Sequence, residues 1–341
     1  MRSWPTSGTG SWTTAEDGVA RESDRAAAPT ASSTPAPGQA DAPHGGPGGL
    51  VAEVTARVGS TREAAWIVEH ARRDARGNGP AGDPRAVREA ALGLAGRRSS
   101  GEPLQYVLGT WQFRLLELAV DRRVLIPRSE TEQVVEVALA ELGRMAAGRG
   151  PGDGPLVCVD LGTGSGAIAL SLAVEGVGPA PALPLEIWAT DRSADAVEVA
   201  RANLVALAAV DPAAAARVTT AVGAWFDALP DRLARRVDLV VSNPPYVSPE
   251  EYAGLDPEVR DWEPVDALVA ARGVSGVAGM ADVEAVVAGA ARWLRPAGAL
   301  VVELAPSQAY GAIDAARRAG FARVGTAHDL AGRLRMLVAE R

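Results

Sequence analysis

Residues 160–167 read Asp160-Leu161-Gly162-Thr163-Gly164-Ser165-Gly166-Ala167 and join an apolar run, residues 156–161, to a helical pattern, residues 167–174. Glycines permit a tight turn between such a strand and helix, and they let a ligand approach the backbone closely. The N-terminus of the following helix adds N–H groups that can donate to a ligand. This strand, loop and helix therefore predict a cofactor-binding loop within an α/β fold.

Strand and helix patterns alternate from residue 131 to the C-terminus. Such alternation favours a mainly parallel sheet that is covered by helices on both faces. The connection between the last two strands, residues 327–333, is too short for a helical crossover, so we expect these two strands to be antiparallel. The predicted strands are residues 156–161, 185–190, 218–222, 237–242, 299–304, 322–326 and 334–339, and the predicted helices are residues 132–147, 167–174, 194–208, 282–294 and 308–319.

An acidic residue, Asp191, follows the second predicted strand. A carboxylate in this place can accept hydrogen bonds from ribose hydroxyls. The loop alone leaves the cofactor open, because residues 162–167 also fit the Gly-x-Gly-x-x-Ala fingerprint of dinucleotide-binding proteins. Binding of NAD(P) is therefore an alternative at this stage.

A second motif, Asn243-Pro244-Pro245-Tyr246, follows the apolar strand at residues 237–242. Neither proline has an N–H group to donate, so the chain must leave the sheet at its carboxyl edge. An asparagine side chain, free backbone carbonyls and an aromatic ring then lie beside the expected cofactor. Because an amide opposite fixed carbonyls can hold an NH2 group, the motif predicts group transfer to an amino or amide nitrogen.

The chain divides into four parts by composition and pattern. Residues 1–48 are rich in small and polar residues and proline, and are expected to form a disordered extension. Residues 49–104 carry apolar side chains at helical spacing and predict a small N-terminal helical domain. Residues 105–127, beginning with a β-leaning piece at 105–108, predict a β-hairpin linker. Residues 128–341 hold the α/β domain.

Composition limits the possible partners and the compartment. The formal net charge of -8 provides no overall basic field for nucleic acid, and all 34 basic residues counted as Lys or Arg are arginine. The single cysteine, Cys158, rules out an internal disulfide framework and fits a reduced, cytoplasmic setting. No apolar run approaches the ~20 residues that a membrane helix needs, and the N-terminus does not resemble a secretory signal. The three histidines are scattered, so we expect no metal site.

The loop resembles the first motif of S-adenosylmethionine-dependent methyltransferases. That Rossmann-like class I fold has strand order 3-2-1-4-5-7-6 with an antiparallel last strand. From about residue 50 to the C-terminus, further motifs resemble the PrmC/HemK family of N5-glutamine methyltransferases. These motifs are residues 101–106 (Gly-Glu-Pro-Leu-Gln-Tyr), 126–132 (Ile-Pro-Arg-Ser-Glu-Thr-Glu), 225–226 (Trp-Phe), 241–246, 262–264 (Trp-Glu-Pro), 302–304 with Gln308, and 329–333 (Asp-Leu-Ala-Gly-Arg).

This resemblance implies methyl transfer from S-adenosylmethionine to the N5 side-chain amide nitrogen of the glutamine in the Gly-Gly-Gln (GGQ) motif of class I peptide chain release factors. It implies that the helical domain recognises the substrate, without direct contact to nucleic acid or membrane, and we expect a monomer. It assigns catalysis to Asn243, Pro244 and Tyr246, which bind the substrate glutamine together with Pro245. The implied cofactor residues are Gly162, Thr163, Gly164, Ser165 and Gly166 at the methionine and ribose, Asp191 at the ribose hydroxyls, Trp225 beside the adenine, and Asn243.

Some positions depart from the family pattern, and two other functions remain alternatives. Ala224 stands where the family has an aspartate before Trp-Phe, and the loss of that aspartate predicts weaker cofactor binding. Ser129 stands where the family has a proline. Thr131 is interpreted as a helix cap, and Glu303 as support for the sheet edge. The alternatives are an N6-adenine nucleic-acid methyltransferase, which should carry a basic recognition region, and a non-catalytic cofactor-binding scaffold.

Overall fold

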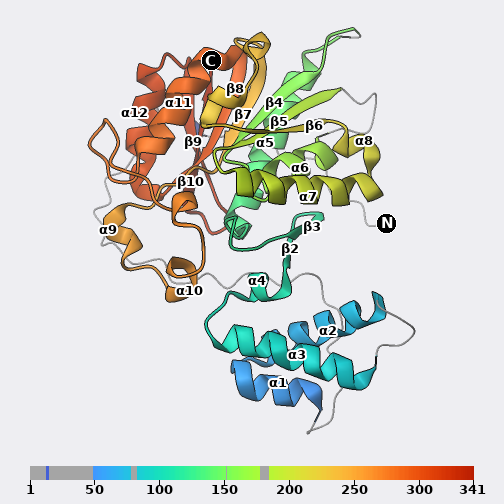
Figure 1. Cartoon of the computed structure of the whole chain (residues 1–341). Helices are drawn as coiled ribbons and strands as arrows, with labels where there is room; N and C mark the ends of the chain where they lie inside the picture. Colours follow the sequence, from blue (N-terminus) through green and yellow to red (C-terminus); the bar gives the residue numbers. More distant parts are fainter. Residues whose placement is uncertain (1–12, 15–48, 78–82, 151, 177–183) are drawn as a thin grey trace.

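The computed structural model describes residues 13–14, 49–77, 83–150, 152–176 and 184–341. Its centre is an eight-stranded sheet with the order β1-β9-β10-β8-β7-β4-β5-β6 (Figure 1). Strands β4 to β8 pair in parallel, whereas β10 is antiparallel to β8 and β9. Without β1, the sheet has the predicted order 3-2-1-4-5-7-6. The bounds are β4 Leu156–Leu161, β5 Leu185–Asp191, β6 Val218–Val222, β7 Val237–Ser242, β8 Leu294–Glu303, β9 Arg323–His328 and β10 Leu334–Glu340.

Helices cover both faces of this sheet (Figure 1). One apolar cluster joins one sheet face to α5, α6 and α8, and a second joins the other face to α11 and α12. Every residue of β4 and β7 is buried, as expected for parallel strands between two helical layers. The helices are α5 Ser129–Ala147, α6 Ala167–Glu175, α7 Ala194–Val210, α8 Pro212–Ala215, α11 Ala281–Trp293 and α12 Ala309–Arg318.

The N-terminal helices α1 (Leu50–Val58), α2 (Thr61–Gly77) and α3 (Pro84–Ser99) pack around an apolar cluster of their own. They lie below the sheet in Figure 1, at the end where its strands lead into the candidate site. Arg98 of α3 links them to the rest of the chain, because its guanidinium pairs with Glu63 and also with Glu258 in α10 (Pro257–Arg260).

A short helix and a hairpin connect these helices to the α/β part. The piece at residues 105–108 was expected to lean towards β structure, and this is wrong: α4 spans Leu104–Leu108. It buries Tyr106 and Val107 and ends at Gly109, whose φ of 73° lies in the left-handed region. The hairpin follows as β2 (Thr110–Phe113) and β3 (Leu116–Ala119), which pair antiparallel.

The expected strands are present, although β8 begins five residues earlier than the predicted 299–304. The predicted helices are also present and shift by a few residues at their ends. The extension expected to be disordered, residues 1–48, lies outside the described residues apart from Thr13–Thr14. These two residues form β1 and pair antiparallel with Thr326 and Gly325 of β9.

The single cysteine lies in the middle of the sheet. Cys158 is fully buried in β4, and this burial raises the pKa of its thiol well above the ordinary range. The thiolate is the reactive form of cysteine, so a buried thiol with a raised pKa is inert towards alkylating reagents.

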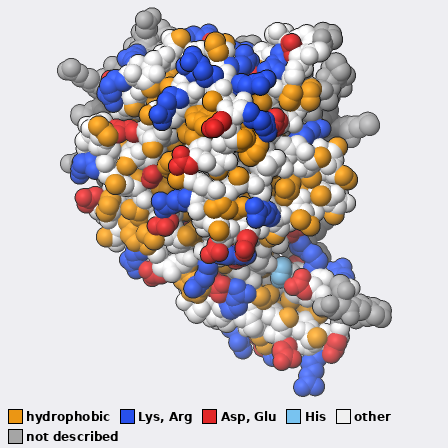
Figure 2. Space-filling model, turned by 45° about the horizontal axis from the view of Figure 1, so that its top comes forward, with side chains coloured by type: hydrophobic (Ala, Val, Ile, Leu, Met, Phe, Trp, Pro, Cys, Tyr) orange, Lys and Arg blue, Asp and Glu red, His pale blue; other side chains and the backbone are white. Residues whose placement is uncertain are grey.

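An arginine-rich groove of about 720 Å³ lies at the amino ends of β4, β7 and β8. Figure 2 views this side of the molecule, where basic side chains gather. The buried Asp238 at the start of β7 binds the guanidinium groups of Arg149 and Arg295. The arginines that line the groove are Arg144, Arg149, Arg232, Arg235, Arg236 and Arg295. In the described part of the chain, no helix combines the length and apolar character that crossing a bilayer requires.

Candidate active site

The predicted glycine loop, residues 162–166, joins β4 to α6 at the carboxyl edge of the sheet. Gly162, Gly164 and Gly166 have φ angles of 73°, 54° and 86°, which side chains disfavour. A Cβ atom added at Gly164 would meet nothing within 4 Å, so the backbone there is open to a ligand. The loop thus combines a turn that needs glycine with an accessible backbone.

The first residue of the loop motif, Asp160, holds the loop in shape. Its Oδ2 accepts hydrogen bonds from the Thr163 hydroxyl (2.6 Å) and the Ala169 N–H (3.1 Å). Asp160 is completely buried, and burial raises its pKa to about 7. Its Oδ1 has no hydrogen-bond partner among the described residues.

Two further predicted cofactor residues lie against the glycine loop. Asp191 ends β5, and its two oxygens accept from the N–H groups of Gly164 (3.0 Å) and Ser193 (2.9 Å). Burial raises the Asp191 pKa. The Trp225 ring lies 3.8 Å from the position that a Cβ of Gly162 would take. The fold therefore brings the loop, Asp191 and Trp225 together.

The Asn243-Pro244-Pro245-Tyr246 segment lies beside this loop, because β7 and β4 pair up to Ser242 and Leu161. The Asn243 Nδ2 donates to the Thr131 hydroxyl at 3.1 Å. Among the described residues, neither the Asn243 Oδ1 nor the Pro244 carbonyl accepts a hydrogen bond. Both acceptors, one on the half-buried Asn243 and one on the buried Pro244, therefore keep unused acceptor capacity.

Glu303, the last residue of β8, contacts this segment and the start of α5. Its Oε2 accepts from the Thr131 hydroxyl at 2.7 Å, and its Oε1 lies 3.4 Å from the Tyr246 hydroxyl. Glu303 is completely buried, and burial raises its pKa to about 7. We call Asn243, Thr131, Glu303 and Tyr246 the amide network.

Two residues, Gln308 and Gly279, hold the backbone of Tyr246 in place. The Gln308 Nε2 donates to the Tyr246 carbonyl at 2.8 Å and to the Ala278 carbonyl at 3.2 Å. Gly279, with a φ of 67°, packs so closely that an added Cβ would collide with the Tyr246 carbonyl oxygen. This part of the site is therefore rigid.

Sequence patterns did not reveal the partners of Asn243. Thr131 was expected to cap a helix, but α5 begins one turn earlier, with Arg128 at the N-cap, and the Thr131 hydroxyl donates to Glu303. Glu303 does lie at the end of a strand, yet its carboxylate contacts site residues. The only signal was that both positions fall within motifs at 126–132 and 302–304.

Ala224, the position that departs from the family pattern, is the N-cap residue of the short 3-10 helix Trp225–Ala228 and makes no side-chain cap hydrogen bond.

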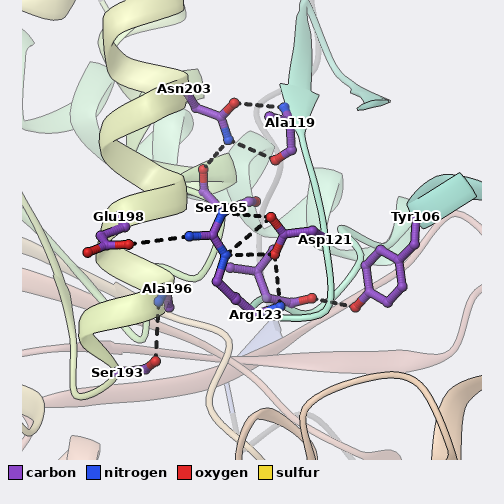
Figure 3. Close-up of polar contacts among 10 residues, drawn as sticks. Tyr106, Ala119, Asp121, Arg123, Ser165, Ser193, Ala196, Glu198 and Asn203 are labelled. Carbon is purple, nitrogen blue, oxygen red and sulfur yellow. Dashed lines mark hydrogen bonds and ion pairs between the residues drawn. The ribbon is translucent and has the colours of Figure 1, made fainter. Parts of the chain in front are cut away.

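Asn203 of α7 ties the glycine loop to the hairpin (Figure 3). Its Nδ2 donates to the Ser165 carbonyl (2.8 Å) and the Ala119 carbonyl (3.1 Å), and its Oδ1 accepts from the Ala119 N–H (2.7 Å). Nearby, Arg123 pairs with Asp121 and with Glu198 of α7, all at the surface (Figure 3).

We predict that Asn203→Ala destabilises the protein by about 2–4 kcal/mol, because the buried Ser165 carbonyl and two groups of the half-buried Ala119 lose a hydrogen-bond partner. The thermal midpoint, measured by circular dichroism, should fall by several degrees. Arg123→Ala is the matched control, because exposed ion pairs contribute only about 0–1 kcal/mol. Equal midpoints for the two variants would show that Asn203 does not fasten the loop.

Comparison with known proteins places this site in a class. Residues 155–254 match the model of the methyltransferase small domain. Together with the fold and the glycine loop, this match makes the protein an S-adenosylmethionine-dependent methyltransferase. A release factor glutamine methyltransferase of Gloeobacter violaceus is 39% identical, over 75% of this chain and 82% of its own length.

Two further release factor glutamine methyltransferases are similar. That of Mycolicibacterium smegmatis is 39% identical over 76% of this chain and 82% of its own length, and that of Cereibacter sphaeroides is 35% identical over 74% and 78%. The chain belongs to the release factor glutamine methyltransferase family. A solved 16S rRNA N2 G1207 methyltransferase of T. thermophilus is more distant, at 20% identity and a TM-score of 0.43, over 68% of this chain and 49% of that chain.

Proposed function

We propose that this enzyme transfers the methyl group of S-adenosylmethionine to the N5 amide nitrogen of the glutamine in the GGQ motif of class I release factors. The observation that carries the proposal is a pair of adjacent acceptors, the Asn243 Oδ1 and the Pro244 carbonyl, that have no hydrogen-bond partner among the described residues. A primary amide has two N–H hydrogens in one plane, and two acceptors can hold both.

The residues around the glycine loop fit the cofactor. We infer that residues 162–166 line its methionine and ribose, that Asp191 accepts from the ribose hydroxyls, and that Trp225 packs beside the adenine. The Asp191 oxygens accept from the N–H groups of Gly164 and Ser193, and a carboxylate has about four acceptor sites, so acceptor capacity remains. The open space above Gly164 lets the ligand reach the backbone.

The task of the protein residues is mainly placement, because a bound sulfonium supplies an already activated methyl group. The amide nitrogen is a poor nucleophile, since its lone pair is delocalised into the carbonyl. Asn243 and Pro244 would hold both amide hydrogens and aim the nitrogen, which can lower the barrier by several kcal/mol. The same acceptors stabilise positive charge that develops on the nitrogen, and its proton leaves to water. The Tyr246 ring would pack against the face of the planar amide.

A cavity of about 470 Å³ between the helical region and the α/β part suits recognition of the larger substrate. Trp66 and His70 of α2 line it together with Trp111 of β2 and Ser129 and Glu132 of α5. Ser129 and Glu132 belong to the first turn of α5, the same turn that carries Thr131 of the amide network. The proposal therefore includes α1–α3 in substrate recognition. We further propose that the enzyme acts as a monomer in the cytoplasm.

The alternative of adenine methylation in nucleic acid is less well supported. The arginine-rich groove lies at the amino ends of the strands, whereas Asn243 follows the carboxyl end of β7. The six residues of β7 span about 20 Å at ~3.3 Å per residue, so the basic side chains of the groove lie at the opposite edge of the sheet from Asn243.

The test is mass spectrometry of a class I release factor after incubation with the enzyme and S-adenosylmethionine. We expect one methyl group on the GGQ peptide, and none on a release factor whose motif glutamine is replaced by glutamate. Duplex DNA is the parallel substrate, and methylation of its adenines instead would overturn the proposal. The scaffold alternative predicts that neither substrate is methylated. Calorimetry with the cofactor then shows whether the protein binds S-adenosylmethionine at all.

A further inference from the structure

We propose that Thr131 and Glu303 are positioning residues that lock the Asn243 amide with its oxygen towards the substrate. The inference rests on the proposed function, in which the Asn243 Oδ1 accepts a substrate N–H. Three separate elements supply the groups: the start of α5, the end of β8 and the turn after β7. Thr131 and Glu303 are buried, so water does not compete for their hydrogen bonds.

The direction of each hydrogen bond follows from the number of protons. A carboxylate only accepts, and a hydroxyl has one proton. With Glu303 ionised, the Thr131 proton must point to the Glu303 Oε2, 2.7 Å away. The Thr131 oxygen can then only accept, so the Asn243 side chain must present its NH2 group to it, at 3.1 Å. The Asn243 Oδ1 consequently faces away from Thr131 and remains free for the substrate.

Protonation of Glu303 would remove this constraint. A protonated carboxyl can donate to the Thr131 oxygen, which releases the Thr131 proton to the Asn243 oxygen and favours a rotated amide. The NH2 group of Asn243 would then face the NH2 group of the substrate, and neither could accept.

The surroundings place this protonation within reach of neutral pH. Burial raises the Glu303 pKa to about 7, and Glu130 of α5 raises it as well. Hydrogen bonds from Thr131 and Tyr246 and the charge of Arg335 on β10 act in the opposite direction. The charge of Arg128 lowers the pKa of Tyr246, and Arg333 pairs with Glu130. Because the ionised form is the orienting one, activity should rise with pH through about 7.

The orientation can be tested without any substrate. The sequence has only three asparagines, Asn78, Asn203 and Asn243, so selective 15N-asparagine labelling gives three side-chain NH2 signals. Asn243→Asp identifies the Asn243 pair by its loss. We expect slow hydrogen exchange of this pair in the wild type and Thr131→Ser, and fast exchange in Thr131→Val. Asn203 serves as the internal control for folding.

Kinetics on the release factor give the second readout. Thr131→Val should lower kcat by about 10²-fold with little change in KM, because the amide is misaligned, and Thr131→Ser should restore it. The acidic limb of the wild-type pH profile should be absent in Glu303→Gln. Slow exchange in Thr131→Val, or an unchanged acidic limb in Glu303→Gln, would overturn the inference. If the wild type methylates no release factor but the exchange pattern holds, only the proposed function fails.

Discussion

Replacing Asn243 by alanine should lower kcat for release factor methylation by about 10²–10³-fold, the usual loss when one fixed polar group at a reacting centre is removed. The reason is that the Pro244 carbonyl alone can hold only one of the two amide hydrogens. The partner that Asn243 leaves behind, the Thr131 hydroxyl, still donates to Glu303, so the fold should tolerate the change.

Three measurements together decide this prediction. Single-turnover methylation gives the rate of the chemical step, calorimetry gives cofactor affinity, and circular dichroism gives the thermal midpoint. We expect a large loss in the first and little change in the others. Near-normal methylation with intact cofactor binding would rule out the placement mechanism.

Gly279→Ala should be the most damaging substitution in the loop that precedes α11. Its left-handed backbone costs an alanine about 1–2 kcal/mol, and the new methyl group would in addition collide with the Tyr246 carbonyl. Relief of this collision must displace either Tyr246 or Gln308, the side chain that fixes it. We expect a total loss of about 3–5 kcal/mol in stability and about 10²-fold in kcat.

Gly276→Ala is a matched control three residues away. Gly276 also has a left-handed backbone, with a φ of 83°, but an added Cβ there meets nothing within 4 Å. This variant should lose only about 1–2 kcal/mol and should methylate at close to the wild-type rate. Urea denaturation and steady-state kinetics of both variants separate the backbone cost from the collision. Equal kcat values would show that Tyr246 need not be held in place.

Local patterns were sufficient for the strands, the mainly parallel sheet and its antiparallel last pair, whereas the strand order came from the family resemblance. They were insufficient for the amide network. Strands buried on both faces are continuous apolar runs, so β4 and β7 could be placed to the residue. Thr131 and Glu303 are 172 residues apart, and no local pattern reports a hydrogen bond over that separation. The error at residues 105–108 has a similar origin, because the burial of Tyr106 and Val107 depends on the packing of other elements.

The glycine loop and the Asn-Pro-Pro-Tyr segment were recognised because each depends on backbone chemistry that only a few residues provide. Gly162 and Gly164 need left-handed angles, and consecutive prolines must end a strand. Asn203, by contrast, lies within an ordinary helical pattern in α7. Its role at Ser165 and Ala119 depends on how the hairpin docks, which the sequence does not display.

The inert thiol in β4 makes this chain a convenient carrier for fluorescent dyes. Because Cys158 is buried and the chain has no lysine, two introduced cysteines would be its only accessible thiols, and the N-terminus its only reactive amine. Ala90 in α3 and Val274 in the loop before α11 are both exposed, so Ala90→Cys and Val274→Cys can carry a donor and an acceptor. Energy transfer between them would follow, in single molecules, whether the helical region closes over a release factor during turnover.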